Sequence, residues 1–255
     1  MTINYQSMGE GKPLIIIHGL FGTSDNLKAV ARELSDEHKV YLIDAPGHGD
    51  SDTVVPLSIA NMANAVSDFI KQLNVGPVQI LGHSLGGKIA MEIALANPEL
   101  ISKLIVADIA PVQYKPRHDD IISSLQAVPL STLENRKDAD EILARKINEP
   151  GVRSFLLKSL VRDKSKPGEW MWRFNLDQLS SDYNELIKSN REGTYSGPTL
   201  FIIGSESSYV LPEHRGEIVG RFPNTKAKTI NGAGHWLHAE RSVAFVKICR
   251  DFLSE

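Results

Sequence analysis

Short apolar runs without polar alternation recur along the chain, and most are followed by residues with helical spacing. Strands that are buried on both faces of a parallel sheet have this continuous, β-branched pattern. The runs that predict such strands lie at 14–17, 40–43, 78–81, 104–107, 198–203 and 227–230. Helical spacing lies at 27–34, 58–73, 85–97 and 239–253, and residues 2–6 predict a short edge strand. Strands that alternate with helices predict an α/β fold, with a mostly parallel sheet and helices on both faces.

The pattern changes after Pro111. From Val112 to Tyr195 the sequence predicts helices and loops without buried strands. We expect residues 112–195 to form a helical cap insertion over the sheet, and residues 1–111 and 196–255 to form the core domain. The most aromatic part of the cap, residues 168–175, admits two interpretations. It is either local packing or one wall of an apolar substrate pocket.

Composition and charge give no indication of a nucleic-acid or membrane partner. The 255 residues are 42% hydrophobic and 23% charged, with a net charge of −3. This balance favours neither nucleic acid nor an anionic membrane as a partner. The first residues do not combine a basic segment with a long apolar one, so we expect no signal peptide, and no apolar run reaches membrane-spanning length. The single cysteine, Cys249, allows no intramolecular disulfide, fits a cytoplasmic protein and lies in a pattern typical of a packed thiol.

The apolar run 78–81 leads directly into Gly82-His83-Ser84-Leu85-Gly86, and a helical pattern follows. Gly-x-Ser-x-Gly between a strand and a helix indicates a nucleophile elbow. In such a turn, glycines two positions before and after the serine remove Cβ atoms that would collide. The hydroxyl is lifted above the sheet at a helix N-terminus, where unpaired N–H groups favour an oxyanion. The alternative interpretation of Ser84 is a helix N-cap without chemistry.

Polar side chains follow several of the predicted strands. His18, Asp44, Ser84 and Asp108 each stand where an apolar run ends. The carboxyl ends of parallel strands lie at one edge of a sheet, where ligands bind. We therefore expect these four side chains to converge on one rim.

Four motifs at predicted strand ends resemble those of the α/β-hydrolase family, over nearly the whole chain. They are His18-Gly19-Leu20, Asp44-x-x-Gly47-x-Gly49-x-Ser51, Gly82–Gly86 and Gly234-His235. More narrowly, the bacterial YbfF-type esterases are similar at residues 108–112, 168–170, 173–175 and 232–240. The resemblance implies an α/β-hydrolase fold and a catalytic triad in the order Ser, Asp, His.

The resemblance implies that His235, in the loop after the last strand, is the general base. An imidazole titrates near neutral pH and can take the proton of a serine hydroxyl. His238 is a rival, although we expect it to be a hydrogen-bonded structural residue. We expect His18 to bond the loop backbone, and we assign no chemistry to His48 or His83.

The position of the triad acid differs from the common pattern of the family. Many members carry an aspartate in a Gly-x-x-Asp turn, but here that turn reads Gly204-Ser205-Glu206-Ser207. The hydroxyl of Ser207 cannot supply the negative charge that orients and stabilises an imidazolium. The YbfF-type resemblance implies Asp108, after the strand that follows the nucleophile helix, as the acid. Glu206 is the alternative, and we expect Ser207 to be a neutral auxiliary beside His235.

An oxyanion hole needs two backbone donors aimed at the developing charge. We expect the N–H of Leu85, directly after the nucleophile, to be one donor, and the N–H of Leu20, in the loop after His18, to be the other. We expect Asp44 and the glycine turn 47–51 to be structural, because tight turns use glycine and side-chain hydrogen bonds in this way.

These features predict a serine carboxylesterase that hydrolyses small to medium acyl esters through an acyl-enzyme, without a cofactor or a metal ion. Its expected partner is a small-molecule ester, and the sequence makes no prediction of oligomeric state. Thioester hydrolysis, carbon–carbon bond hydrolysis and cofactor-free peroxidation use the same triad and stay open as alternatives. A binding protein with little turnover stays open as well. Haloalkane dehalogenation is disfavoured, because it needs a carboxylate where Ser84 stands.

Overall fold

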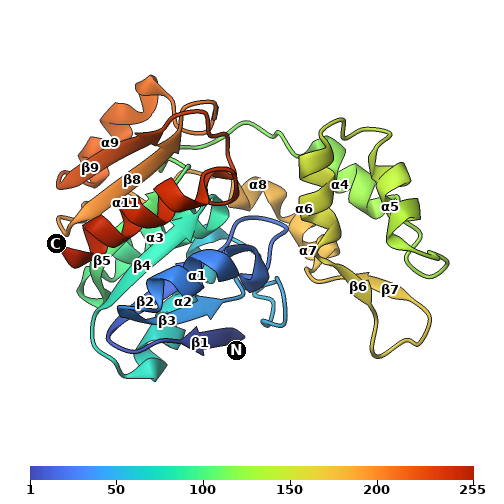
Figure 1. Cartoon of the computed structure of the whole chain (residues 1–255), viewed down its shortest axis with the longest axis horizontal. Helices are drawn as coiled ribbons and strands as arrows, with labels where there is room; N and C mark the ends of the chain where they lie inside the picture. The colour runs from blue at the N-terminus through green and yellow to red at the C-terminus, as the bar shows by residue number, and fades with distance from the viewer.

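A seven-stranded sheet forms the centre of the computed structural model, which describes residues 1–255 (Figure 1). In spatial order the strands are β1 (Tyr5–Met8), β3 (His38–Ile43), β2 (Lys12–Ile17), β4 (Val78–His83), β5 (Ile101–Ala107), β8 (Thr199–Gly204) and β9 (Thr225–Ile230). Strand β1 runs antiparallel to β3 at one edge, and the other neighbours pair in parallel. The predicted α/β fold with a mostly parallel sheet is confirmed.

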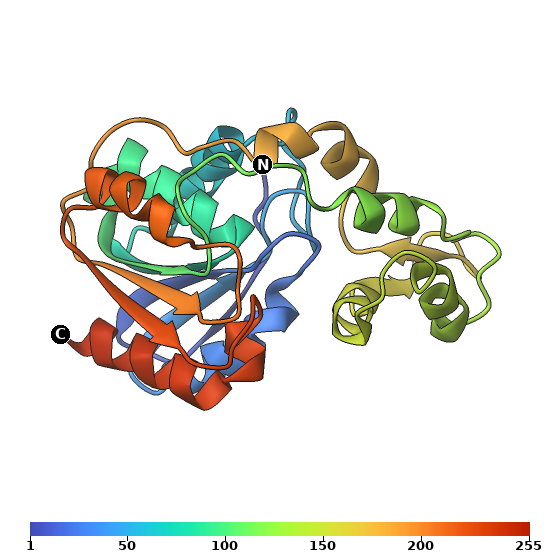
Figure 2. The same cartoon turned by 90° about the horizontal axis from the view of Figure 1, so that it is seen from above.

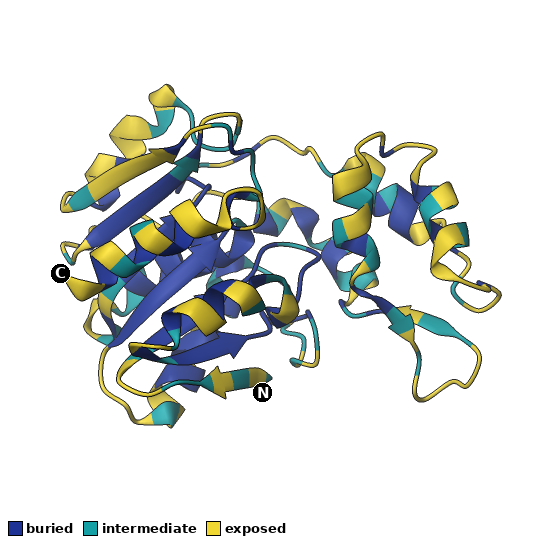
Figure 3. Ribbon diagram, in the orientation of Figure 1, coloured by how far each residue is buried: buried dark blue, intermediate teal, exposed yellow.

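Helices cover both faces of the sheet (Figures 1 and 2). One face carries α1 (Lys28–Leu34) and α11 (Ser242–Ser254), and the other carries α2 (Ile59–Leu73), α3 (Leu85–Ala96) and α9 (Arg215–Arg221). In β2, Leu14 and Ile16 pack with α1 and α11, whereas Ile15 and Ile17 pack with α2 and α3. Both faces of the central strands are therefore buried, as Figure 3 shows, and this explains their apolar sequence.

The boundaries of several elements differ from the expected ones. Strand β1 covers Tyr5–Met8 rather than residues 2–6. Strand β3 begins at His38, before its apolar run, because its backbone already pairs with β2 there. The expected C-terminal helix is two helices, α10 (Leu237–Glu240) and α11, because Arg241 between them is not helical, with φ −135° and ψ 50°.

The elements between β5 and β8 lie outside the sheet, on the right of Figure 1. We call residues 112–195 the cap segment; its helices are α4 (Asp119–Gln126), α5 (Arg136–Leu143), α6 (Pro150–Leu157), α7 (Leu176–Ser181) and α8 (Tyr183–Leu186). Besides the expected helices and loops, the cap segment holds one short pair of strands, each with one buried residue of three. Strands β6 (Leu160–Arg162) and β7 (Trp170–Trp172) pair antiparallel, and Leu160 and Trp172 are buried. Each has only 3 residues, too few for side-chain alternation to be recognised. The division into core and cap domains stays a prediction.

One attachment joins the cap segment to the glycine turn after β3. The N–H of Gly49 donates to the carbonyl oxygen of Arg173 at 2.6 Å, and the N–H of Asn175 donates to that of Gly47 at 2.9 Å. The Arg173 guanidinium also pairs with the carboxylate of Asp25 at 3.1 Å. The glycine turn, expected to be structural, thus holds part of the cap segment.

A second attachment joins both ends of the cap segment to α3. The buried ammonium of Lys88 donates to the carbonyl oxygen of Val112, at 2.8 Å, and to that of Lys188. Burial lowers the pKa of Lys88 to about 7. One turn further along α3, the carboxylate of Glu92 accepts a hydrogen bond from the side chain of Asn190 at 2.9 Å. Helix α3, which follows Ser84, therefore also positions the cap segment.

None of the helices is both long enough and apolar enough to cross a bilayer. Cys249 is fully buried within α11, where burial raises the pKa of its thiol. The expectation of a packed structural thiol is confirmed.

Asp44, directly after β3, is a fully buried carboxylate. It accepts hydrogen bonds from the N–H of Ser24 at 2.7 Å, the side-chain amide of Asn4 at 2.8 Å and the N–H of Asp50 at 3.0 Å. Burial alone would raise the pKa of Asp44, but these hydrogen bonds outweigh burial and lower the pKa below its ordinary value. Asp44 therefore acts structurally, as expected.

Asp44→Asn should lower the free energy of unfolding by about 2–4 kcal/mol at neutral pH, because the amide turns a donor toward N–H groups that need an acceptor. A carboxylate whose pKa is lowered by folding adds stability above its ordinary pKa and loses that contribution as the pH falls through the lowered value. The difference between wild type and variant should therefore shrink below about pH 4. Urea denaturation at a series of pH values measures it.

The matched control is Asp50→Asn, because the Asp50 side chain is 72% exposed. Its loss should stay below about 1 kcal/mol, as for other exposed ion pairs. Equal losses in the two variants would contradict the structural role of Asp44.

Candidate active site

Ser84 lies at the sharp turn between β4 and α3. Its backbone has φ 54° and ψ −119°, a conformation that non-glycine residues rarely adopt. A Cβ atom at Gly82 would overlap the carbonyl oxygen of Gly86, and one at Gly86 would overlap that of Ile17. The expected strained turn is therefore confirmed. Ser84 occupies the N-cap position of α3, but its side chain makes no capping hydrogen bond and is free for other contacts.

The side chains of Ser84, His235 and Asp108 form one hydrogen-bonded row. His235 Nδ1 lies 2.7 Å from Asp108 Oδ2, and His235 Nε2 lies 2.9 Å from Ser84 Oγ. A carboxylate can only accept a hydrogen bond, so Nδ1 carries the proton and Nε2 is the acceptor for the Ser84 hydroxyl. This is the protonation state in which an imidazole can take a proton from the serine.

Asp108 is fully buried at the end of β5 and has a positive φ of 52°. Its Oδ1 accepts a hydrogen bond from the N–H of Gly204 at 3.0 Å. Its Oδ2 accepts hydrogen bonds from His235 and from the hydroxyl of Ser207. The carboxylate is therefore held by groups from β8, from the loop after β8 and from the loop after β9.

The alternative acid, Glu206, makes no hydrogen bond to His235. Its N–H donates to the carbonyl oxygen of Ala233 at 2.9 Å, and the residue is exposed. Ser207 stands near His235, but its hydroxyl bonds to Asp108 rather than to the imidazole. Of the two carboxylates weighed from the sequence, only Asp108 contacts the ring.

Two residues without an assigned role contact His235. The Nε2–H of His83 donates to the carbonyl oxygen of His235 at 2.8 Å. Burial lowers the pKa of His83 well below its ordinary value, and the nearby rings of His238 and His235 lower it further. His83 is therefore neutral. The ring of Tyr209 stacks on that of His235, with centroids 3.8 Å apart and an interplanar angle of 15°. In the sequence, the only indication of a role for His83 is that it directly precedes Ser84. The only indication for Tyr209 is that it follows the Gly204–Ser207 turn.

His238, the rival base, lies away from the row and packs edge-on against His83, with ring centroids 4.5 Å apart. Burial, and then the neighbouring His235, lowers the pKa of His238 to about 3. The expectation that His238 is hydrogen-bonded is wrong for Nδ1, which is buried without a partner. Packing rather than hydrogen bonding therefore holds this ring.

His18 bonds the loop backbone as expected. Its Nδ1–H donates to the carbonyl oxygen of Gly19 at 2.8 Å, and its Nε2 accepts from the N–H of Ala45 at 3.0 Å. His48 likewise accepts from the N–H of Phe21 at 3.3 Å, and burial lowers its pKa to about 3. The rings of His18 and His48 therefore fix the loops that lie beside the hydrogen-bonded row of Ser84, His235 and Asp108.

The N–H groups of Leu20 and Leu85 donate to no other atom of the chain. Leu85 is the first residue of α3, where N–H groups have no partner within the helix. Leu20 lies in the loop after β2 and lines the same cavity as Ser84. Both donors are thus available to a ligand beside the serine.

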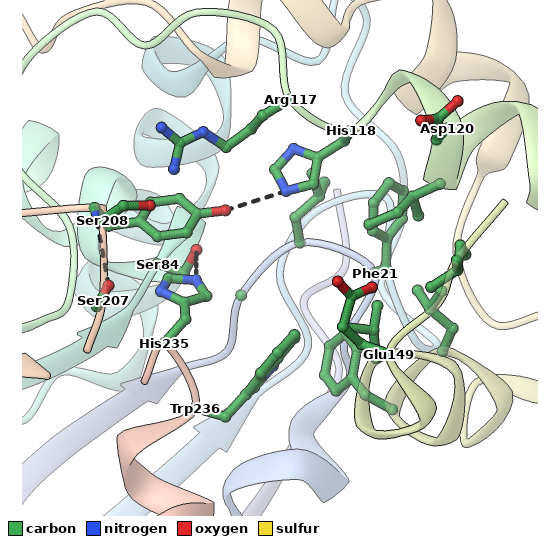
Figure 4. A pocket seen from close by; sticks show the side chains of 18 of the residues that line it. Phe21, Ser84, Arg117, His118, Asp120, Glu149, Ser207, Ser208, His235 and Trp236 are labelled. Carbon is green, nitrogen blue, oxygen red and sulfur yellow. Dashed lines mark hydrogen bonds between the residues drawn. The ribbon is translucent and has the colours of Figure 1, made fainter. Parts of the chain in front are cut away.

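A cavity of about 660 Å³ lies between the rim of the sheet and the cap segment, and Ser84 and His235 line it (Figure 4). The cap segment contributes Arg117, His118, Ile121, Val152 and Phe155, among others. The rings of Phe155 and Trp236 lie 5.6 Å apart, so the cap segment and the His235 loop meet across the cavity. No group of three or more His, Cys, Asp or Glu side chains is arranged to hold a metal ion.

The aromatic stretch 168–175 does not line this cavity. Trp172 stacks on Phe174, with ring centroids 5.6 Å apart and an interplanar angle of 11°. The indole N–H of Trp170 donates to the carbonyl oxygen of Leu133 at 2.8 Å. These contacts favour local packing, and none of the residues 168–175 forms a wall of the cavity at Ser84.

Known proteins are similar over nearly the whole chain. Esterase YbfF of Escherichia coli (strain K12) is 36% identical, over 98% of this chain and 96% of its own. A putative esterase/lipase of Haemophilus influenzae is 40% identical, over 95% of this chain and 83% of its own. The sn-1-specific diacylglycerol lipase ABHD11 of Mus musculus is 34% identical, over 94% of this chain and 80% of its own.

The solved structure of a marine microorganism esterase matches the fold with a TM-score of 0.94, at 37% identity and 98% coverage of both chains. The model of the alpha/beta hydrolase family matches residues 14–248. These findings confirm the resemblance that the strand-end motifs implied. The chain therefore belongs to the alpha/beta hydrolase family.

Proposed function

We propose that this protein is a serine carboxylesterase that hydrolyses small to medium acyl esters through an acyl-enzyme. The observation that carries the proposal is the hydrogen-bonded row from Asp108 through His235 to Ser84, beside a cavity of about 660 Å³. Relatives named as esterases and lipases support ester hydrolysis as the reaction class.

In the first half-reaction Ser84 Oγ attacks the ester carbonyl carbon while His235 Nε2 takes the hydroxyl proton. The oxyanion of the tetrahedral intermediate accepts hydrogen bonds from the N–H groups of Leu20 and Leu85. The imidazolium then gives its proton to the alcohol oxygen, the carbon–oxygen bond to the alcohol breaks, and the acyl group stays on Ser84. In the second half-reaction His235 activates a water molecule, which releases the acid and restores the serine.

Asp108 orients His235 and stabilises the imidazolium that forms in both half-reactions. The groups around the His235 ring do not oppose its positive charge. Because the pKa values of His83 and His238 are lowered, both are neutral near pH 7 and do not repel an imidazolium. Ser207 donates a hydrogen bond to the acid and supports it without carrying charge.

Ser84→Ala should lower kcat/KM for p-nitrophenyl butyrate by about 10⁴-fold or more, because the nucleophile is lost. Spectrophotometric release of p-nitrophenol measures the rate. Ser196→Ala, at an exposed serine outside the cavity, is the control and should behave as wild type. Near-wild-type hydrolysis by Ser84→Ala would overturn the proposed function.

A fluorophosphonate probe separates an esterase from a binding protein on the same fold. An activated serine attacks the probe, so Ser84 should be labelled in wild type and the label should be absent in Ser84→Ala. Mass spectrometry of the digested protein locates the modified residue. An unlabelled wild-type Ser84 would favour the binding protein.

Asp108→Asn should lower kcat by about 10³–10⁴-fold, because an amide neither selects the correct imidazole tautomer nor stabilises the imidazolium. Ser207→Ala removes one hydrogen bond to the acid and should cost no more than about tenfold. Glu206→Gln should leave kcat close to that of wild type. Steady-state kinetics with p-nitrophenyl butyrate compares the three variants, and a crippled Glu206→Gln enzyme would move the acid to Glu206.

A further inference from the structure

A second, smaller cavity meets the large one at Ser84. Its volume is about 40 Å³, and its apolar lining includes Leu85, Ile109, Tyr114, Leu186 and Ile187. No acidic residue lines it. The two cavities share a boundary at Ser84, because the same five residues line both: Leu20, Ser84, Arg117, His118 and Tyr209.

Two polar groups that line the small cavity, those of Lys88 and Tyr114, already have hydrogen-bond partners within the chain. The Lys88 ammonium donates to the carbonyl oxygens of Val112 and Lys188. The Tyr114 hydroxyl donates to the carbonyl oxygen of Tyr209 at 2.6 Å and accepts from the N–H of Ala110 at 2.8 Å. The surface that remains for a ligand is mainly apolar, which suits a hydrocarbon chain.

The guanidinium of Arg117, at the boundary of the two cavities, lies over the ring of Tyr209, 4.4 Å from its centroid. The ring of His235 stacks on the same Tyr209 ring, with centroids 3.8 Å apart. The stack of three groups therefore forms a partition beside Ser84 and limits how a substrate can lie across the two cavities.

The position of the base decides which end of an ester enters which cavity. His235 Nε2 must protonate the alcohol oxygen as the carbon–oxygen bond breaks. His235 lines the large cavity and not the small one. The alcohol must therefore point into the large cavity, and the remaining substituent of the carbonyl carbon, the acyl chain, points away from the base. Leu85, whose N–H is proposed to hold the oxyanion, lines the small cavity only.

We propose that the small cavity is the acyl site, that the large cavity is the alcohol site, and that the enzyme prefers short acyl chains on bulky alcohols. This inference rests on the proposed esterase function. A water molecule needs roughly 10–15 Å³ of such space, so about 40 Å³ accommodates a chain of about three carbon atoms beyond the carbonyl. The large cavity, at about 660 Å³, has the size of sites that bind drug-sized molecules.

The side chain of Ile187 offers the cleanest test of the acyl site. Ile187 follows α8 and is half-buried, and its carbonyl oxygen accepts from the N–H of Tyr114 at 2.9 Å, a contact that side-chain substitution preserves. Ile187→Ala enlarges the small cavity, and Ile187→Phe fills it. Leu186, the other residue of this wall, is only 3% exposed, so its truncation risks the fold.

The experiment measures kcat/KM for p-nitrophenyl esters of increasing chain length, from acetate to laurate. Wild type should peak at propionate or butyrate and fall at least about tenfold by octanoate, because a packed wall does not admit extra methylenes. Ile187→Ala should move the peak about two carbons longer, and Ile187→Phe should confine activity to acetate. Ile121→Ala, in the large cavity, is the matched control and should leave the peak where it is in wild type.

Three results would overturn the inference alone, provided that Ser84 still reacts with fluorophosphonate and esters are hydrolysed. They are a wild-type peak at octanoate or longer, an unchanged peak in both Ile187 variants, and a peak that moves in Ile121→Ala instead. Absence of labelling and of hydrolysis for every ester would overturn the proposed esterase function, and this inference with it.

Discussion

The arrangement of the site depends on one buried carboxylate. Asp108 has no exposed surface, and a buried charge destabilises a protein strongly unless hydrogen bonds compensate it. Its donors are the N–H of Gly204, the hydroxyl of Ser207 and the ring of His235. These residues come from β8, from the loop after β8 and from the loop after β9, so the requirement to satisfy this charge draws distant segments to one edge of the sheet.

The same geometry explains how, in the proposed triad, Asp108 together with Ser207 can orient His235 where the common family pattern uses one aspartate after β8. Strands β5 and β8 are parallel neighbours, so their carboxyl ends lie about 5 Å apart at the same edge. A carboxylate after either strand can reach the imidazole from nearly the same point. Here the charge comes from β5, and the position after β8 holds a hydroxyl that donates to it. The carboxylate gains a hydrogen bond that a second aspartate would replace with repulsion.

The features that could be predicted from the sequence are those with a local cause. The continuous apolar run of β2 reflects burial on two faces, and the strain at Ser84 is created and relieved within five residues, by Gly82 and Gly86. The local sequence pattern alone did not identify Asp108 as the acid. Asp108 was preferred over Glu206 because the chain resembles known esterases. The roles of Tyr209 and Lys88 could not be predicted, since they follow from contacts between residues far apart in the sequence, such as Lys88 with Lys188. The strands of the β6–β7 pair were too short for a recognisable pattern.

Helix α3 connects Ser84 to the small cavity that is proposed as the acyl site. Ser84 precedes its first turn, the N–H of Leu85 begins it, and Lys88 on its next turn binds the carbonyl oxygens at both ends of the cap segment. Ile187, which lines the small cavity, directly precedes Lys188, whose carbonyl oxygen is one of these acceptors. The same helix therefore positions both Ser84 and the end of the cap segment that carries Ile187.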